Sequence, residues 1–342
     1  MKQLKIVVAL VTGLFAFTSV NAGELTVTGS MQATYQSEID RQTGNPLGMN
    51  TDLTFTGSTD TDFGTATWTM GTDGTFLGDS GADHKYTLAT DIGTFKIGNS
   101  GDSANAIDDI TPTAFEEANG SGSGTYTVDF GSGLEGSMSL GYNNADVGGT
   151  GISVDYTYYP KVDGKTNNEK AASGDNNAGV KSANTVNVGI PVASVPFIGS
   201  TPLSVAKVTL GYENQDATDS DYQAKEGATV AVVFPVGPLK VGYQKKAYAA
   251  IATDAHQKDF YKDDIIGIAY AVNDDFAISY NRYESSQHNN DGTNTEQETK
   301  SLNVAYTVGG LTLALADAKT SNAGYTAGTD DETRTLSIKT AF

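Results

Sequence analysis

Apolar and polar side chains alternate along most of this chain. Between residues 25 and 36, Leu25 and Val27 share one face of an extended segment, and Thr26 and Thr28 share the other. Because successive side chains of a strand point to opposite faces, the pattern predicts a strand with one apolar and one hydrated face. The alternation recurs in residues 52–58, 65–70, 137–142, 301–306 and 335–342. Stripes with helical spacing are almost absent, so we predict one long antiparallel meander.

The connectors between these segments fall into two classes. The short ones are residues 58–63, 91–93, 131–134, 235–238, 273–275 and 309–310, and the long polar ones are 37–48, 71–82, 214–225, 249–262, 284–297 and 320–332. Short turns at one end and long loops at the other are typical of a transmembrane β-barrel. A sheet in lipid has to close on itself, because every backbone polar group must be paired. A soluble β-sandwich also alternates, but the polar face here is Thr, Ser and Asn throughout, as a hydrated lumen requires.

The length of the chain suits a barrel of 16 strands. A strand of about ten residues at ~3.3 Å each, tilted by ~40°, rises ~25 Å, which matches the apolar band of such barrels. The strand count conflicts between residues 143 and 202, because 151–159 (counted from the N-terminus) and 184–195 (counted from the C-terminus) both claim the eighth position. We expect 161–183 to be a large surface loop in an all-β barrel of 16 strands, and an 18-stranded barrel is the alternative.

Composition and charge exclude several kinds of function. The chain has no Cys, which excludes disulfides and thiolate chemistry. It has 41 acidic and 21 basic residues, a formal net charge of −20, so we expect no nucleic-acid partner. His84, His256 and His288 lack the spacing of zinc ligands.

Two further motifs have a simpler explanation than a ligand site. Asp216, Asp219 and Asp221 could bind Ca²⁺, but acids in such a run usually solvate a loop, so we predict no cofactor and no metal. Residues 131–136 read GSGLEG, yet a strand follows them where a dinucleotide site needs a helix, so we predict a turn. No spacing of Ser, His and Asp indicates a nucleophile, so the protein is not expected to be an enzyme.

The N-terminus has the layout of a secretory signal peptide. MKQLK is basic, about 15 apolar residues follow, and small residues end at Ala22. The apolar stretch is short for a membrane-spanning helix, which needs ~20 residues. We therefore expect residues 1–22 to be cleaved and residues 23–342 to form a single barrel domain.

Several segments resemble the general outer-membrane porins of Gram-negative bacteria, which are trimeric diffusion channels. GELTVTGSMQATY is similar to their first strand, DLTFTGSTDTDFGTATWTM to their second and third, and TLATDIGTFKIGNSGDS to the fourth and fifth. The ending TRTLSIKTAF resembles the assembly signal of outer-membrane proteins, with Phe342 as its terminal aromatic. The resemblance implies a homotrimer in the outer membrane, in contact with lipid and lipopolysaccharide.

The resemblance also implies a pore constriction formed by the third long loop, loop 3, which spans residues 99–122. Its acidic residues would face a basic wall across the lumen, and strand parity points five lysines inward. The acids are Asp102, Asp108, Asp109, Glu116 and Glu117, and the lysines are Lys85, Lys96, Lys207, Lys240 and Lys339. Thr113 and Glu116 fit a helix capping box, which predicts a short helical turn in the loop.

Aromatic side chains recur on the apolar faces of the strands, where we expect them to form the girdles at the lipid interfaces. They are Tyr35, Trp68, Tyr142, Tyr212, Tyr243, Tyr270, Tyr280, Tyr306 and Phe342.

These features together predict a water-filled, weakly cation-selective channel for passive diffusion of small hydrophilic solutes and ions. Two alternatives stay open at this point: a substrate-specific channel of 18 strands, and a secreted or surface adhesin rich in β-structure.

Overall fold

A computed structural model describes residues 25–38, 44–73, 83–99, 103, 105–118, 130–131, 133–134, 136–162, 180–217, 225–249, 258–289 and 292–342. The predicted signal peptide, residues 1–22, lies outside this range, as do residues 163–179 of the predicted surface loop. Within the described residues, no helix is long and apolar enough to span a membrane.

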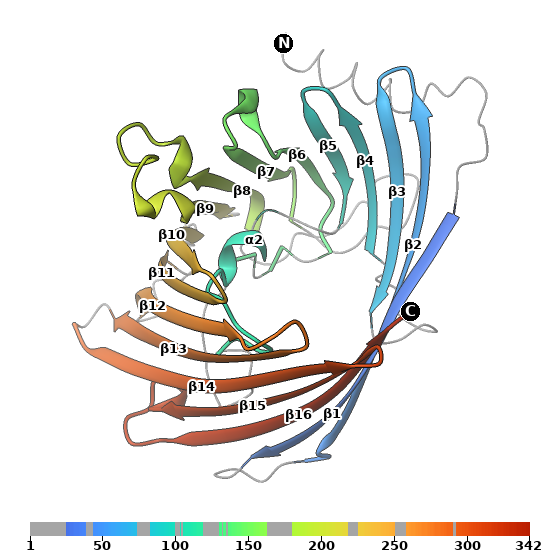
Figure 1. Cartoon of the computed structure of the whole chain (residues 1–342). Helices are drawn as coiled ribbons and strands as arrows, with labels where there is room; N and C mark the ends of the chain where they lie inside the picture. Colours follow the sequence, from blue (N-terminus) through green and yellow to red (C-terminus); the bar gives the residue numbers. More distant parts are fainter. Residues whose placement is uncertain are drawn as a thin grey trace.

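Sixteen antiparallel strands form a closed barrel, in which each strand pairs with its neighbours in sequence and β1 pairs with β16 (Figure 1). The strands are β1 (Leu25–Glu38), β2 (Leu47–Thr61), β3 (Gly64–Asp73), β4 (Asp83–Thr90), β5 (Gly93–Gly98), β6 (Ser139–Asn144), β7 (Ser153–Tyr159), β8 (Val180–Pro191), β9 (Lys207–Ala217), β10 (Lys225–Val236), β11 (Leu239–Ala249), β12 (Lys258–Ala271), β13 (Phe276–Asn289), β14 (Asn294–Val308), β15 (Leu311–Ser321) and β16 (Asp331–Ala341). The all-β barrel of 16 strands is confirmed, and the 18-strand alternative is wrong.

The conflict over the eighth strand is resolved by the pairing of β5 with β6. Since these two strands are hydrogen-bonded neighbours, the whole of residues 99–138 is one connector, and residues 153–159 form the seventh strand. The eighth strand begins at Val180, so the last four residues of the predicted surface loop 161–183 belong to β8 instead. Gly131, Gly133, Leu134 and Gly136 lie in turns, which precede β6 within the long connector and do not join two paired strands.

All the short connectors lie at one end of the barrel, and the tightest turns are among them. Gly309 and Gly310 connect β14 to β15 with φ values of 57° and 83°. A two-residue hairpin with positive φ at both positions matches the twist of the flanking strands, and glycine adopts that conformation without strain. Because short turns face the periplasm in barrels of this type, the long loops mark the extracellular end.

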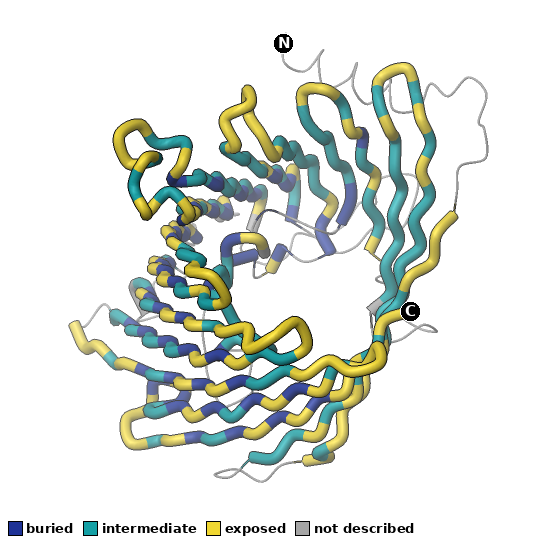
Figure 2. The backbone as a smooth tube through the Cα atoms, viewed as in Figure 1, coloured by how far each residue is buried: buried dark blue, intermediate teal, exposed yellow. Residues whose placement is uncertain are grey.

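Side chains point alternately toward the lumen and away from it. The predicted aromatic residues lie on the outward face, and most are exposed there, for example Tyr212, Tyr280 and Tyr306. Inward residues differ between the two sides of the barrel: they are mostly buried on β9–β16 and only half-buried or exposed on β1–β3 (Figure 2).

Candidate functional site

Loop 3 turns into the barrel and lies against one part of its inner wall. The short helix α2 (Asn105–Asp108) lies inside the ring of strands (Figure 1). Further along the loop, the Ile110 N–H donates to Gln244 of β11 at 2.9 Å and the Ala114 N–H donates to Ser279 of β13 at 2.9 Å. The Glu116 N–H then donates to Asn303 of β14 at 3.3 Å. Loop 3 therefore crosses the inner face from β9 toward β14.

Four glycines on successive strands make room for this path. A Cβ on Gly211 of β9 would lie 2.5 Å from Ile107, and one on Gly227 of β10 would lie 2.9 Å from Phe130. A Cβ on Gly242 of β11 would overlap Pro112, and one on Gly267 of β12 would lie 2.8 Å from the Pro112 carbonyl oxygen. Since Cβ atoms do not approach other atoms this closely, any larger residue at these positions would push the loop away from the wall.

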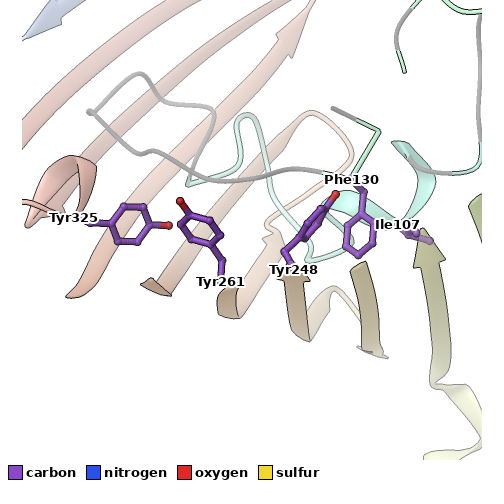
Figure 3. Packing of buried hydrophobic residues seen from close by; sticks show 5 residues of the cluster. All are labelled: Ile107, Phe130, Tyr248, Tyr261 and Tyr325. Atoms are coloured by element: carbon purple, nitrogen blue, oxygen red, sulfur yellow. The ribbon is translucent and has the colours of Figure 1, made fainter. Parts of the chain in front are cut away.

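Apolar side chains anchor both limbs of the long connector at the same place. Ile107 of α2 and Phe130 of the returning limb pack against Tyr248 of β11, and all three are buried (Figure 3). The Phe130 and Tyr248 ring centroids are 4.5 Å apart. Tyr261 and Tyr325 extend the cluster, with ring centroids 5.5 Å apart. Burial of this apolar surface favours the folded-in position of the loop.

A fully buried lysine, Lys246 of β11, joins loop 3 to the wall. Its Nζ lies 3.1 Å from Asp108, 3.6 Å from Asp109 and 4.0 Å from Asp263 of β12. The aromatic ring of Tyr283 lies under the same ammonium group, 5.4 Å from Nζ to the ring centroid. A buried charge is tolerated only where it is paired and hydrogen-bonded, and these groups supply both.

A second buried ion pair holds the returning limb. Lys225 of β10 lies 3.1 Å from Glu213 of β9, and both side chains are buried. The other Glu213 oxygen accepts from the Gly131 N–H at 2.5 Å. The Phe130 N–H donates to Asp108 at 3.1 Å, so the two limbs are also tied directly to each other.

Glu116 and Glu117 belong to the anchored part of loop 3, because the Glu116 N–H donates to Asn303 and Glu117 lies beside Asp109. Burial raises the pKa of Glu117 to about 8, and repulsion from Asp109 contributes in the same direction. Burial also raises the pKa of Glu116. A carboxyl group with a pKa near 8 is mostly protonated at neutral pH, so Glu117 contributes little negative charge there.

The wall across the lumen from this assembly is built differently. The inward residues of β1–β3 are mainly Thr and Ser, and none of those that the structure describes is buried. Lys96 of β5 forms an ion pair with Asp155 of β7 at 2.9 Å, with both side chains partly exposed to the lumen. The lumen thus has two different walls. The dry wall, on β9–β14, is buried under loop 3, and the wet wall, on β1–β3, exposes hydroxyl groups to the lumen.

Comparison with known families agrees with this architecture. Residues 7–338 match the profile of a family described as Gram-negative porin. The chain belongs to the Gram-negative porin family. It is therefore an integral β-barrel of the outer membrane that forms a channel, and the secreted adhesin is wrong. The substrate-specific alternative loses its premise, because the barrel does not have 18 strands.

Solved structures share the porin fold at low sequence identity. OmpF of Salmonella typhi in complex with daunomycin is 12% identical with a TM-score of 0.66, over 94% of this chain and 98% of that one. An anion-selective porin from Comamonas acidovorans is 12% identical, with a TM-score of 0.63 over 94% of this chain and 100% of that one. The trimer form of OmpT, an outer-membrane protein of Vibrio cholerae, is 12% identical with a TM-score of 0.60, over 94% and 100% of the two chains. A search of curated proteins found no match.

The porin structure places the predicted loop residues unevenly. Asp108 and Asp109 contact Lys246, and Glu117 lies beside Asp109. The Glu116 N–H donates to Asn303 of β14, whereas Asp102 is outside the described residues. The predicted helical turn at Thr113 is wrong. Thr113 Oγ1 instead donates to the Glu116 carbonyl oxygen at 2.8 Å and holds a bend, and the loop's helix is α2.

The five predicted lysines all have inward parity, but they do not gather opposite loop 3. Lys207, Lys240 and Lys339 lie near the short-turn ends of β9, β11 and β16, and Lys85 lies near the long-loop end of β4. Within the described residues, none of the five forms an ion pair with an acid of the loop, whereas Lys246 does. The alternation that turns Lys240 inward also turns Lys246 inward, and this signal in the sequence was missed.

Of the three acids considered as Ca²⁺ ligands, the described residues include Asp216. Asp216 accepts a hydrogen bond from Ser182 at 2.6 Å, while Asp219 and Asp221 lie outside the described residues.

Proposed function

We propose that this porin conducts small hydrophilic solutes and ions passively, prefers cations, and catalyses no reaction. The observation that carries the cation preference is the excess of carboxylates at loop 3. Its described residues hold Asp108, Asp109, Glu116 and Glu117 and no basic residue, and Lys246 of the wall pairs with Asp108 and Asp109. The anion-selective porin of the same fold indicates that the barrel alone does not determine the sign, so this chain's own charges must do so.

The preference should be modest. In a wide wet pore, two unit charges at 4 Å interact by about 1 kcal/mol, and salt at physiological strength screens them beyond roughly 8 Å. Pairing with Lys246 and protonation of Glu117 lower the effective charge of the loop further.

A reversal potential across a planar bilayer in a salt gradient tests the sign. We expect cation preference that falls as ionic strength rises, and anion preference at low salt would contradict the proposal. Asp108→Asn combined with Glu116→Gln should weaken the preference, and unchanged selectivity would show that loop 3 does not determine it.

We also propose a homotrimer embedded in outer-membrane lipid and lipopolysaccharide. The outward faces of β1–β8 support a protein contact, because their described residues include no Asp, Glu, Lys or Arg. We expect the unheated protein to migrate on a gel at about three times the mass of the monomer. After boiling it should migrate as the monomer. Migration as a monomer under mild detergent would contradict it.

A further inference from the structure

The connector between β15 and β16, residues 322–330, folds onto the same inner wall as loop 3. We call it loop 8, and it contains the short 3-10 helix η5 (Ala323–Tyr325). The Gly324 N–H donates to the inward Gln297 of β14 at 2.8 Å. The buried ring of Tyr325 lies beside Tyr261 of β12 (Figure 3). Two loops that are far apart in the sequence therefore meet on one wall of the lumen.

The backbone of loop 8 is held in an uncommon conformation. Asn322 and Tyr325 have φ values of 53° and 57°. A side chain other than glycine rarely adopts positive φ, and a bulky one does so only where its surroundings hold it there. Asn322 supplies part of that support, because its Oδ1 accepts from the Gly328 N–H at 2.9 Å and its Nδ2 donates to the Glu296 carbonyl oxygen at 3.0 Å. Loop 8 is thus a fixed structure that directs Tyr325 at the wall.

The hydroxyl group of Tyr325 begins a chain of hydrogen bonds that leads to loop 3. Ser285 Oγ of β13 donates to the carboxylate of Asp263 on β12. Since a serine hydroxyl has a single proton, Ser285 accepts from the Tyr325 hydroxyl, 2.7 Å away. Asp263 in turn lies 4.0 Å from Nζ of Lys246, which is 3.1 Å from Asp108 of loop 3.

The position of Asp263 makes these hydroxyl groups important for loop 3. Asp263 is buried, and it competes with Asp108 and Asp109 for the ammonium group of Lys246. A buried carboxylate is stabilised by hydrogen bonds that point at it, and Ser285 supplies one such bond. If that bond is lost, Asp263 draws Lys246 toward itself and away from the acids of the loop.

We propose that Tyr325 of loop 8 is a positioning residue for loop 3. By donating to Ser285, its hydroxyl keeps the Ser285 proton directed at Asp263, and this leaves Lys246 available to hold Asp108. Loop 3 is therefore held by a second loop as well as by the strands. The inference rests on the channel that the barrel forms and is independent of the proposed cation preference.

Single-channel recordings of the purified porin in a planar bilayer test the proposal, because loop 3 interrupts the current when it leaves the wall for the lumen. The loss of one buried hydrogen bond changes a population by about five-fold, so Tyr325→Phe should raise the frequency of brief interruptions by about that factor. Ser285→Ala breaks the next bond of the chain and should raise it at least as much. The double variant should match Ser285→Ala alone, because both changes act on the same chain.

The matched control is Ser337→Ala. It also removes a buried inward hydroxyl group, whose described partner is Gln32 of β1 at 2.9 Å. The frequency of interruptions should stay that of the parent channel. An equal rise in this variant would overturn the proposal, as would an unchanged frequency in Tyr325→Phe or additive effects in the double variant.

A disulfide distinguishes movement of loop 3 from movement of loop 8. In Tyr325→Phe, the further pair Ala114→Cys with Ser279→Cys ties loop 3 to β13, so oxidation should remove the added interruptions and reduction should restore them. Interruptions that persist in the oxidised protein would mean that loop 8 itself blocks the pore, which contradicts the proposal. Heat-modifiable migration verifies that each variant is folded. The reversal potential reports separately on the proposed cation preference.

Discussion

The two inner walls of this porin use polar residues in opposite ways. On β13, the inward residues Ser279, Asn281 and Tyr283 are buried and hydrogen-bonded to loop 3 or to their neighbours. On β3, the inward Thr67 and Thr69 are only half-buried. The first wall is a buried scaffold that holds loop 3, and the second is a surface exposed to the lumen. Polar alternation therefore identifies the lumen face of a strand, but it does not tell which lumen faces are covered.

The difference has an energetic consequence. A buried polar or charged group that loses its partner suffers the full desolvation cost, whereas an exposed group turns to water. Substitutions of the same kind should thus have large effects on the β9–β14 wall, which carries loop 3, and small effects on the opposite wall.

The largest effect is expected for Lys246→Met. This change leaves Asp108, Asp109 and Asp263 without their shared cation, and breaking a buried charge network in this way costs about 3–5 kcal/mol. Guanidinium unfolding of the porin in detergent measures the loss. The comparison variant Lys96→Met breaks the partly exposed pair with Asp155 and should cost about 1 kcal/mol or less. Equal losses in the two variants would contradict the distinction between the walls.

A steric change comes next. A valine at Gly242 would overlap Pro112, so Gly242→Val should push loop 3 into the lumen, lower single-channel conductance and cost about 1–3 kcal/mol. Gly71 lies on the opposite wall, where a Cβ would have only one neighbour, Asp83, at an ordinary 3.9 Å. Gly71→Val should therefore keep the conductance of the parent channel. A conductance unaffected by Gly242→Val would mean that loop 3 does not lie where we describe it.

The pH dependence of selectivity is a smaller effect. Burial and Asp109 raise the pKa of Glu117 to about 8, so its carboxyl group is neutral below that pH and ionises above it. Cation preference, measured as a reversal potential, should increase between pH 7 and pH 9. Glu117→Gln should remove this increase. A preference that stays constant over this range in the parent protein would show that Glu117 is already ionised at neutral pH.

The smallest effect is expected on the wet wall. Thr67→Val with Thr69→Val replaces two hydroxyl groups that water can solvate, so stability should change by no more than about 0.5 kcal/mol per site. Liposome swelling with small sugars should slow by less than about two-fold. A larger loss would mean that these hydroxyl groups bind solute directly.

The sequence was sufficient to predict the barrel, because alternation and connector length are local properties. The same alternation predicted the outward position of Tyr280. The sequence was not sufficient for the contacts of loop 3. The pairing of Asp108 with Lys246 joins residues 138 positions apart, and nothing local in either segment encodes it. The inward Gly211 and Gly242 gave a hint, since glycine in a strand often marks a close approach of other atoms.

The wrong prediction of a helical turn at Thr113 also results from contacts that are distant in the sequence. Thr113 and Glu116 have the spacing of a capping box, but the Thr113 hydroxyl is used to hold a bend and the Ala114 N–H is satisfied by Ser279 of the wall. Hydrogen bonds from the barrel thus replace those that a helical turn would have made.

Cross-linking tests the central claim, that loop 3 is fixed to the β9–β14 wall, most directly. The chain has no native Cys, so Ala114→Cys with Ser279→Cys introduces a single pair at a point where the Ala114 N–H and the Ser279 hydroxyl oxygen are 2.9 Å apart. We expect this pair to oxidise to a disulfide with the conductance unchanged, while Ala114→Cys with Thr69→Cys on the opposite wall stays reduced. A disulfide in the second variant and none in the first would contradict the account.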